Sequence, residues 1–416
     1  MSFHFVVGAE EIIEQLMIQC WLFQARSGAR SWARQQAELT LERLLTKGLP
    51  YENGSHGLRL DPYAAANMIK TRAGELNDES WAAWQETSHR NAVSLSPEPY
   101  LYELSMRREW HSYVRTPGRS VVLRIPLPSR QAQRGPAVVE IVEPPGCEVE
   151  IRETPGRLEV RLDPAQLEGP VVANVCVKFV GGDTSDPLIT AAPLGGQTTA
   201  DEQVWLRDRE GLIVVNQKVR DLAATLANGC SDAREYLHAV WRWLMSELSF
   251  GDWHRSDLEE GDPLGWLLKT RRADCFLGSS MLVALCRARG IPARLVTGFL
   301  LHPANIGPHS WSEARLAPGL WVPFDFGSWC YSAGNPNDSQ WGSFYRGRVD
   351  ARFLAETAPR EFTGWGSAPP PERWYRLESL DGQRIVHTLH SLPDNRLFRR
   401  DILDLNIHAP ANIAVR

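Results

Sequence analysis

The fold of this chain is decided by residues 274–300, which read DCFLGSSMLVALCRARGIPARLVTGFL. Apolar side chains recur in this stretch every three or four residues until Gly290, and Pro292 follows, so the pattern predicts a helix that begins at about Cys275. Residues 294–301 then read as a buried strand. The stretch therefore predicts a cysteine at the start of a helix that is followed directly by a strand.

Two more strands are expected downstream. Residues 309–316 (HSWSEARL) alternate in polarity, and residues 321–325 (WVPFD) run back after a turn at residues 317–320. In such a hairpin, His309 and Asp325 lie at comparable ends of the two strands. The sequence therefore allows an imidazole and a carboxylate to be neighbours in space.

These residues together indicate nucleophilic chemistry. The positive end of a helix favours an anion, so it should stabilise the thiolate of Cys275 and an oxyanion beside it. An imidazole such as that of His309 can take and return a proton, and a carboxylate such as that of Asp325 can fix the imidazole tautomer. The set predicts Cys275 as nucleophile, His309 as general base and acid, and Asp325 as the orienting group.

The same residues resemble the transglutaminase-like superfamily. The resemblance rests on Asp274-Cys275-Phe276, on residues 287–299 (RARGIPARLVTGF), on His309-Ser310-Trp311 and on residues 321–325. It covers about residues 232–327, roughly a quarter of the chain. It implies an α+β fold with a papain-like core, in which the helix that bears the cysteine packs on an antiparallel sheet, and it implies the same three catalytic roles.

Three regions are expected along the chain. Residues 1–96 show helical periodicity and predict a helical module, which has no counterpart in the resemblance. Residues 97–185 alternate with a period of two and predict an antiparallel β-sandwich, similar to the β domain that often precedes this core in bacterial members of the superfamily. Residues 186–416 predict the catalytic domain, with a C-terminal extension rich in Pro, Gly and Trp in which only scattered short strands, such as residues 384–390, are indicated.

Finer expectations concern particular elements. Helices are expected over residues 212–226 and 232–248. In the N-terminal region, Trp81 and Trp84 lie three residues apart on an expected helix, which favours a place in the core over a surface for a partner. The acidic stretch 257–262 lacks the spacing of calcium ligands and is expected to be a solvated loop.

Composition limits the classes of partner and location. The chain has 416 residues, with 45 Lys and Arg against 50 Asp and Glu, for a net charge of −5. This balance argues against nucleic acid and anionic membrane surfaces as partners. Seven cysteines without paired motifs predict reduced thiols, and neither a signal peptide nor a long apolar run is recognised, so a cytoplasmic protein is expected.

Several residues have competing interpretations. Cys286 lies in the middle of the expected helix and is predicted to be structural. His302 precedes Pro303 in an expected loop, and a surface position is favoured for it over a catalytic one. Trp311 and Trp321 are expected either to line an acyl pocket or to pack against each other across strands.

Two features of the animal transglutaminases find no clear match. In those enzymes an aromatic residue upstream of the cysteine helps to bind the oxyanion, and no motif here chooses among four candidates, which are Trp241, Trp243, Phe250 and Trp253. Their calcium sites have no convincing counterpart either, so neither a metal nor a cofactor is predicted.

The expected function is acyl transfer through a thioester on Cys275. An amine acceptor would give an amide bond, and the acyl donor would be a protein or peptide, such as a glutamine side chain, or a carrier-bound thioester as in the assembly of peptide or polyketide antibiotics. With water as acceptor the same residues would make a cysteine peptidase or amidase. A scaffold that keeps the fold without activity is the remaining alternative, and the sequence indicates no oligomeric state.

Overall fold

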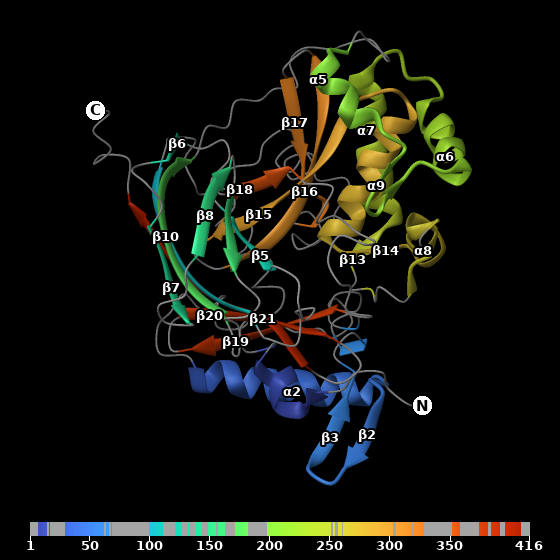
Figure 1. Ribbon diagram of the computed structural model, residues 1–416. Helices are drawn as coiled ribbons and strands as arrows, with labels where there is room; N and C mark the ends of the chain where they lie inside the picture. Colours follow the sequence, from blue (N-terminus) through green and yellow to red (C-terminus); the bar gives the residue numbers. More distant parts are fainter. Residues whose placement is uncertain are drawn as a thin grey trace.

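The computed structural model gives the arrangement of the helices and strands (Figure 1), and it places the segments that carry Cys275, His309 and Asp325. The residues that the structure describes are 7–14, 16, 30–61, 64–65, 68, 100–110, 121–126, 132–133, 138–143, 149–154, 157–162, 171–181, 198–250, 253, 257–259, 261–302, 305–317, 320–327, 352–357, 374–381, 384–391 and 396–408.

Helix α9 (Cys275–Ala288) lies at the heart of the main hydrophobic core. Every residue from Leu277 to Arg287 is buried. A helix buried on all sides must be covered by other elements all round. Strands β15 and β16 contact α9, and so do three helices, namely α6 (Gln217–Ala227), α7 (Ala233–Glu247) and α8 (Pro263–Thr270).

The sheet beside α9 is antiparallel and has the strand order β17-β16-β15-β18. Its strands are β15 (Ala293–His302), β16 (Asn305–Ala317), β17 (Leu320–Phe324) and β18 (Arg352–Thr357). The prediction of a loop between His302 and His309 is wrong. His302 pairs with Asn305, and the pairing of β15 with β16 continues from there without a break to Ala293 and Ala314. Pairing across the hairpin outweighs the local preference of Gly307 and Pro308 for irregular structure.

The helices that lead into α9 begin at side-chain caps. Asp232 accepts a hydrogen bond from the backbone N–H of Glu235 at 2.8 Å and starts α7, close to the expected position. The helix expected from residue 212 begins only at Gln217, because Asn216 caps it by accepting from the N–H of Val219 at 3.1 Å. The preceding residues are in extended structure, in which strand β12 (Ile213–Val214) pairs with β11 (Arg209–Glu210).

Arg287 ties the end of α9 to its surroundings. Its guanidinium donates to the carbonyl of Ala293 at 3.0 Å, to the carbonyl of Arg207 at 3.0 Å and to the carboxylate of Glu210 at 2.6 Å. Burial lowers the pKa of Arg287, and the neighbouring Glu210 opposes that shift. Both side chains are almost completely buried, so loss of either partner would leave a buried charge without compensation and destabilise the fold.

A long sheet lies beside the core, with β4 (Tyr100–Trp110) between β10 (Val171–Gly181) and β21 (Arg396–His408). Its strand order is β19-β20-β21-β4-β10-β6, with β7 pairing to β10 as well. The remaining strands are β6 (Ala132–Gln133), β7 (Val138–Glu143), β19 (Trp374–Asp381) and β20 (Arg384–Ser391). Arg108 on β4 and Asp401 on β21 form a buried ion pair with distances of 2.7 and 2.9 Å. The sheet thus includes strands of the C-terminal extension. Strand β20 confirms the strand expected at residues 384–390, whereas β19 and β21 were not predicted.

A second sheet in the same region has the order β5-β9-β8. Its strands are β5 (Val121–Pro126), β8 (Val149–Thr154) and β9 (Arg157–Leu162), and the register pairs Thr154 with Arg157 where β8 and β9 meet. The chain therefore has mixed helix and sheet content. The β-sandwich and the boundaries at residues 96 and 185 stay predictions.

The N-terminal region combines helix and strand. Helix α2 (Arg30–Thr46) packs with the helical residues 9–14 and with a sheet in the order β1-β3-β2, formed by β1 (Val7–Gly8), β2 (Tyr51–Gly54) and β3 (Gly57–Leu60). The hairpin is a departure from the expected helical module, and it forms where Asn53 and Gly54 supply turn-forming residues. Trp81 and Trp84 lie outside the described residues.

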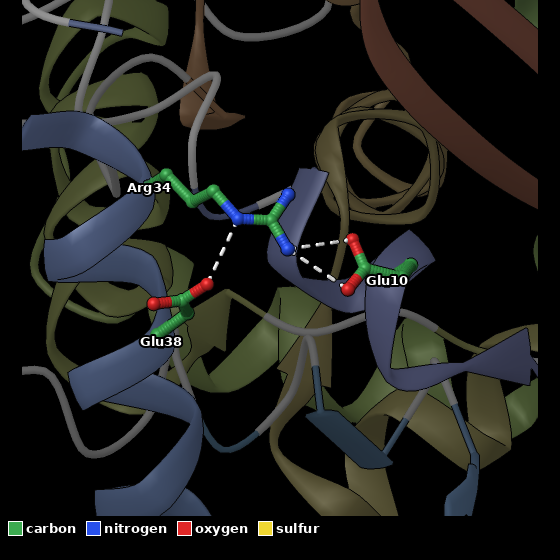
Figure 2. Close-up of polar contacts among 3 residues, drawn as sticks. All are labelled: Glu10, Arg34 and Glu38. Atoms are coloured by element: carbon green, nitrogen blue, oxygen red, sulfur yellow. Dashed lines mark hydrogen bonds and ion pairs between the residues drawn. The ribbon is translucent and has the colours of Figure 1, made fainter. Parts of the chain in front are cut away.

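A charged bridge joins the two helical segments of this region (Figure 2). Arg34 on α2 donates to both carboxylate oxygens of Glu10, at 2.9 and 3.0 Å, and to Glu38 one helical turn further on, at 2.8 Å. The hydrogen bond to Glu10 is the main reason why the pKa of Arg34 is raised. All three side chains are exposed, so the bridge orients the segments more than it stabilises them.

None of the helices within the described ranges is long and apolar enough to cross a membrane.

Four short elements complete the order of the core region. They are α5 (Ala200–Gln203), the 3₁₀ helix η4 (Val204–Leu206), β13 (Ser249–Phe250) and β14 (Arg272–Ala273).

Replacing Arg287 tests the anchoring of α9. The substitution Arg287→Met leaves Glu210 as a buried carboxylate without its cation, and we expect the free energy of unfolding to fall by about 3–5 kcal/mol. The double variant Arg287→Met, Glu210→Leu removes both charges and should recover at least part of that loss. Urea denaturation followed by circular dichroism measures both, and a single-variant loss below about 1 kcal/mol would contradict the interpretation.

Candidate active site

Cys275 is the first residue of α9, and Asp274 caps the helix in front of it. The carboxylate of Asp274 accepts a hydrogen bond from the N–H of Leu277 at 2.7 Å, and its carbonyl accepts from the N–H of Gly278 at 3.0 Å. The N–H groups of Cys275 and Phe276 belong to the same positive helix end. Cys275 is half-buried and is not in a disulfide. Its sulfur thus sits where an anion is favoured.

His309 and Asp325 are held together by the pairing of β16 with β17. Ser312 on β16 pairs with Phe324 on β17, so Asp325 follows directly at the end of the shorter strand. The Nε2 atom of His309 lies 2.8 and 3.0 Å from the two carboxylate oxygens of Asp325. Since the carboxylate engages Nε2, Nδ1 is the ring nitrogen that Asp325 leaves for proton exchange with another group. Both side chains are almost completely buried.

Gly327 shows that Cys275 and His309 are neighbours. A Cβ atom built on Gly327 would lie 2.6 Å from Cβ of Cys275 and 2.9 Å from Cε1 of His309. The two side chains therefore flank the same point, and these atoms are no further apart than the sum of those distances. The structure thus brings together all three residues predicted for catalysis, from α9, β16 and the end of β17.

Phe326 fixes this strand end against the helix. A Cβ atom built on Gly278 would meet the Phe326 ring at 2.3 to 3.0 Å, so only a residue without a side chain fits there. Phe326 itself is fully buried in the main core. Neither Phe326 nor the two glycines was predicted from the sequence, in which the one available signal was a glycine two residues after the expected carboxylate.

The two tryptophans considered for acyl binding lie in different surroundings. Trp311, two residues after His309 on β16, has only 1% of its surface exposed and stacks on the His309 ring, with centroids 6.2 Å apart. Little of that ring is available to a substrate in this structure. Trp321 is half-buried and lies under the guanidinium of Arg294, whose Cζ is 3.8 Å from the centroid of the ring. Trp205 of η4 contacts Trp321 in a T-shaped arrangement. Acyl binding by these residues stays a prediction.

Helix α5 and η4 cover the face of the sheet that carries Trp321. Glu202 pairs with Arg315 at 2.7 Å, and Arg294 pairs with Glu313 at 2.7 Å. All four side chains are largely buried, and the Glu202–Arg315 pair fastens the segment of α5 and η4 to strand β16, which also carries His309.

The aromatic candidates for the oxyanion differ in their contacts. Trp241 is buried against Phe324, with ring centroids 5.8 Å apart. Trp243 lies beneath the guanidinium of Arg271, whose Cζ is 5.7 Å from the centroid of the ring. The indole nitrogens of Trp241 and Trp253 are buried and have no hydrogen-bond partner in the part of the chain that the structure describes. The side chain of Phe250 lies outside that part. The oxyanion partner stays unassigned.

The remaining sequence candidates lie apart from this centre. Cys286 is completely buried in α9, and burial raises the pKa of its thiol strongly. His302 is the last residue of β15 and pairs with Asn305, whereas His309 pairs with Gly298, which lies four residues before His302 on β15. Within the described ranges, no group of three or more His, Cys, Asp or Glu residues is arranged to hold a metal ion. In the acidic stretch, the carboxylate of Asp262 accepts a hydrogen bond from the side-chain amide of Asn216 at 2.6 Å and forms an ion pair with Lys218.

Comparison with known proteins agrees with this geometry. A sequence profile described as the Transglutaminase-like superfamily matches residues 220–326, which include Cys275, His309 and Asp325. None of the curated proteins matches the chain significantly.

Two solved structures are similar to the chain over part of its length. A candidate cysteine protease from Cytophaga hutchinsonii shares 13% identity, with a TM-score of 0.45 over 75% of this chain and 91% of that chain. The periplasmic domain of TgpA from Pseudomonas aeruginosa, bound to ethylmercury, shares 14% identity, with a TM-score of 0.32 over 61% of this chain and 97% of that chain.

Replacing Gly278 tests the packing of the Phe326 ring against α9. Alanine within an unhindered helix normally stabilises relative to glycine by about 0.5–1 kcal/mol. At Gly278 we expect the opposite sign, a loss of about 1–3 kcal/mol for Gly278→Ala, because the added methyl overlaps the buried ring. Urea denaturation measures the change, with Gly261→Ala as the matched control because its Cβ would meet nothing closer than Arg209 at 4.0 Å. A neutral or stabilising Gly278→Ala would be inconsistent with this packing.

Proposed function

We propose, from the premise that residues 220–326 form a transglutaminase-like core, that this protein transfers acyl groups through a thioester on Cys275 to an amine. The observation that carries the proposal is the convergence of three side chains. Cys275 begins a buried helix, His309 lies against the same point as Cys275, and Asp325 engages the far nitrogen of the His309 ring. This is the arrangement that nucleophilic catalysis by a thiol requires.

Acylation would begin with a proton transfer from the Cys275 thiol to Nδ1 of His309. The sulfur then attacks the carbonyl carbon of the donor, and the negative charge moves to the carbonyl oxygen, where the positive end of α9 stabilises it. When the tetrahedral intermediate collapses, the bond to the leaving group breaks and Nδ1 of His309 returns the proton to that group. Cys275 is left as a thioester and His309 as neutral imidazole.

Transfer would follow the same path in reverse. The amine nitrogen attacks the thioester carbonyl while Nδ1 of His309 takes its proton, and the C–S bond breaks to release the amide. The sulfur leaves as a thiolate beside imidazolium, and the proton can return to it. Asp325 holds Nε2–H throughout, so the ring presents the same nitrogen in both steps.

The choice of an amine and of a large donor rests on the size of the remaining chain. The core occupies residues 220–326, and the long sheet and the N-terminal region add surfaces that turnover of a small molecule does not require. We propose that they dock a protein, peptide or carrier-bound thioester as acyl donor, including donors of natural-product assembly. Hydrolysis to the free acid uses the same three residues and is the outcome to be tested against transfer. The cytoplasmic location also stays a prediction.

Differential alkylation tests the nucleophile. At pH 7 we expect iodoacetamide to modify Cys275 at least about 100-fold faster than Cys286, because burial keeps the Cys286 thiol protonated and shielded. Mass spectrometry of peptides from the folded protein measures both rates. The variant His309→Ala should slow modification of Cys275 near neutral pH and leave Cys286 unchanged. Equal reactivity of the two thiols would favour the scaffold alternative.

Product analysis tests the acceptor. We expect incubation with a small acyl thioester and a primary amine to give the amide in proportion to amine concentration, as measured by mass spectrometry. The variant Cys275→Ala should lower turnover at least about 1000-fold, because the covalent route is lost. Release of the free acid at a rate that no amine changes would show a hydrolase instead.

A further inference from the structure

Gly327 occupies a position where any side chain would collide with the proposed catalytic pair. Its built Cβ would lie 2.6 Å from Cβ of Cys275, 2.9 Å from Cε1 of His309 and 3.2 Å from Cα of Cys275. Distances below 3.0 Å are not found around real Cβ atoms, so the neighbours would have to move. Its backbone is not in the left-handed region, unlike that of Gly290. The glycine is therefore required for space and not for its conformation.

The atoms that the Cβ would meet are not easily displaced. Cys275 Cα is backbone at the capped start of α9, and Cys275 Cβ is attached to it directly. The ring of His309 is held at Nε2 by Asp325 and is stacked on the buried Trp311. A methyl group at residue 327 would therefore push against two groups that have little room to give way.

Three consecutive residues thus hold the site, and each does so differently. Asp325 engages Nε2 of His309, Phe326 lies on Gly278 one turn along α9, and Gly327 lies against both Cys275 and His309. The first two contacts fix the backbone of the third. Gly327 consequently cannot retreat from the pair without loss of the hydrogen bond or of the ring packing.

We propose that Gly327 is a positioning residue that sets the separation of the Cys275 sulfur and the His309 ring and closes one side of the pair. This inference rests on the proposed function, because it assumes proton exchange between these two groups. The acyl donor must then approach from the side that Gly327 does not occupy. Misplacement by about 1 Å reduces rates of positioned reactions by about 100-fold, and a loss of that order is expected for Gly327→Ala.

The test is the pH profile of Cys275 alkylation in four proteins, which are the unmodified chain, Gly327→Ala, His309→Ala and Gly261→Ala. A thiol paired with imidazole stays reactive below neutral pH, whereas a solitary thiol loses reactivity as pH falls through about 8.5. We expect Gly327→Ala to shift the profile toward that of His309→Ala. Gly261→Ala should match the unmodified chain, since its Cβ has open space.

The outcomes separate this inference from the proposed function. If the unmodified chain and His309→Ala give the same profile, both the inference and the proposed function are overturned. If His309→Ala shifts the profile but Gly327→Ala does not, the inference alone is overturned. If Gly327→Ala shifts it as well while Gly261→Ala does not, the positioning role is supported.

A second measurement covers the case in which Gly327→Ala folds poorly. The substitution Cys275→Gly removes the Cβ atom that makes the shortest contact with residue 327. Gly327→Ala should lower Tm by at least about 2 °C in the unmodified chain, and by less in the Cys275→Gly background. An equal fall in both backgrounds, or a failure to fold that Cys275→Gly does not relieve, would show that the contact is not the cause and overturn the inference.

Discussion

The buried hydrogen bonds between His309 and Asp325 are the interaction on which the rest of the candidate site depends. Little water reaches the two groups, so the bond is stronger than it would be at the surface, and it would be costly to leave either group without a partner. It fixes the imidazole ring and also the backbone that leaves β17. Because Phe326 and Gly327 follow Asp325 directly, this bond places an aromatic ring and a bare backbone against the first turn of α9.

Local patterns made the arrangement of Cys275, His309 and Asp325 predictable. Helices α7 and α9 each begin one residue after an aspartate, and the sequence shows such caps together with the apolar period behind them. The relation of His309 to Asp325 follows from the alternation of two short strands across a tight turn. The resemblance to the transglutaminase-like superfamily rests on these same segments, and the profile match over residues 220–326 confirms it.

The features that escaped prediction depend on contacts between distant segments. Strand β21 pairs with β4, and β18 pairs with β15, but the period of a strand does not name its partner. The expected loop before His309 is strand because β15 pairs with it. Gly327 illustrates the limit most clearly, since its backbone is ordinary and its requirement for glycine comes only from the atoms of Cys275 and His309. In the sequence its only sign is a glycine two residues after Asp325, which does not name the atoms that it approaches.

The two cysteines of α9 show how one helix provides both an accessible and an inert thiol. Cys286 lies within the stretch that is buried on all sides, and burial raises the pKa of its thiol. Cys275 lies just before that stretch, half-buried and at the positive helix end. The helix dipole alone does not locate the site, because every helix has such an end. Within α9, residues 277–287 are buried whereas Cys275 and Phe276 are half-buried, so a substrate can reach the first turn. Gly327, just after β17, then limits the direction of approach.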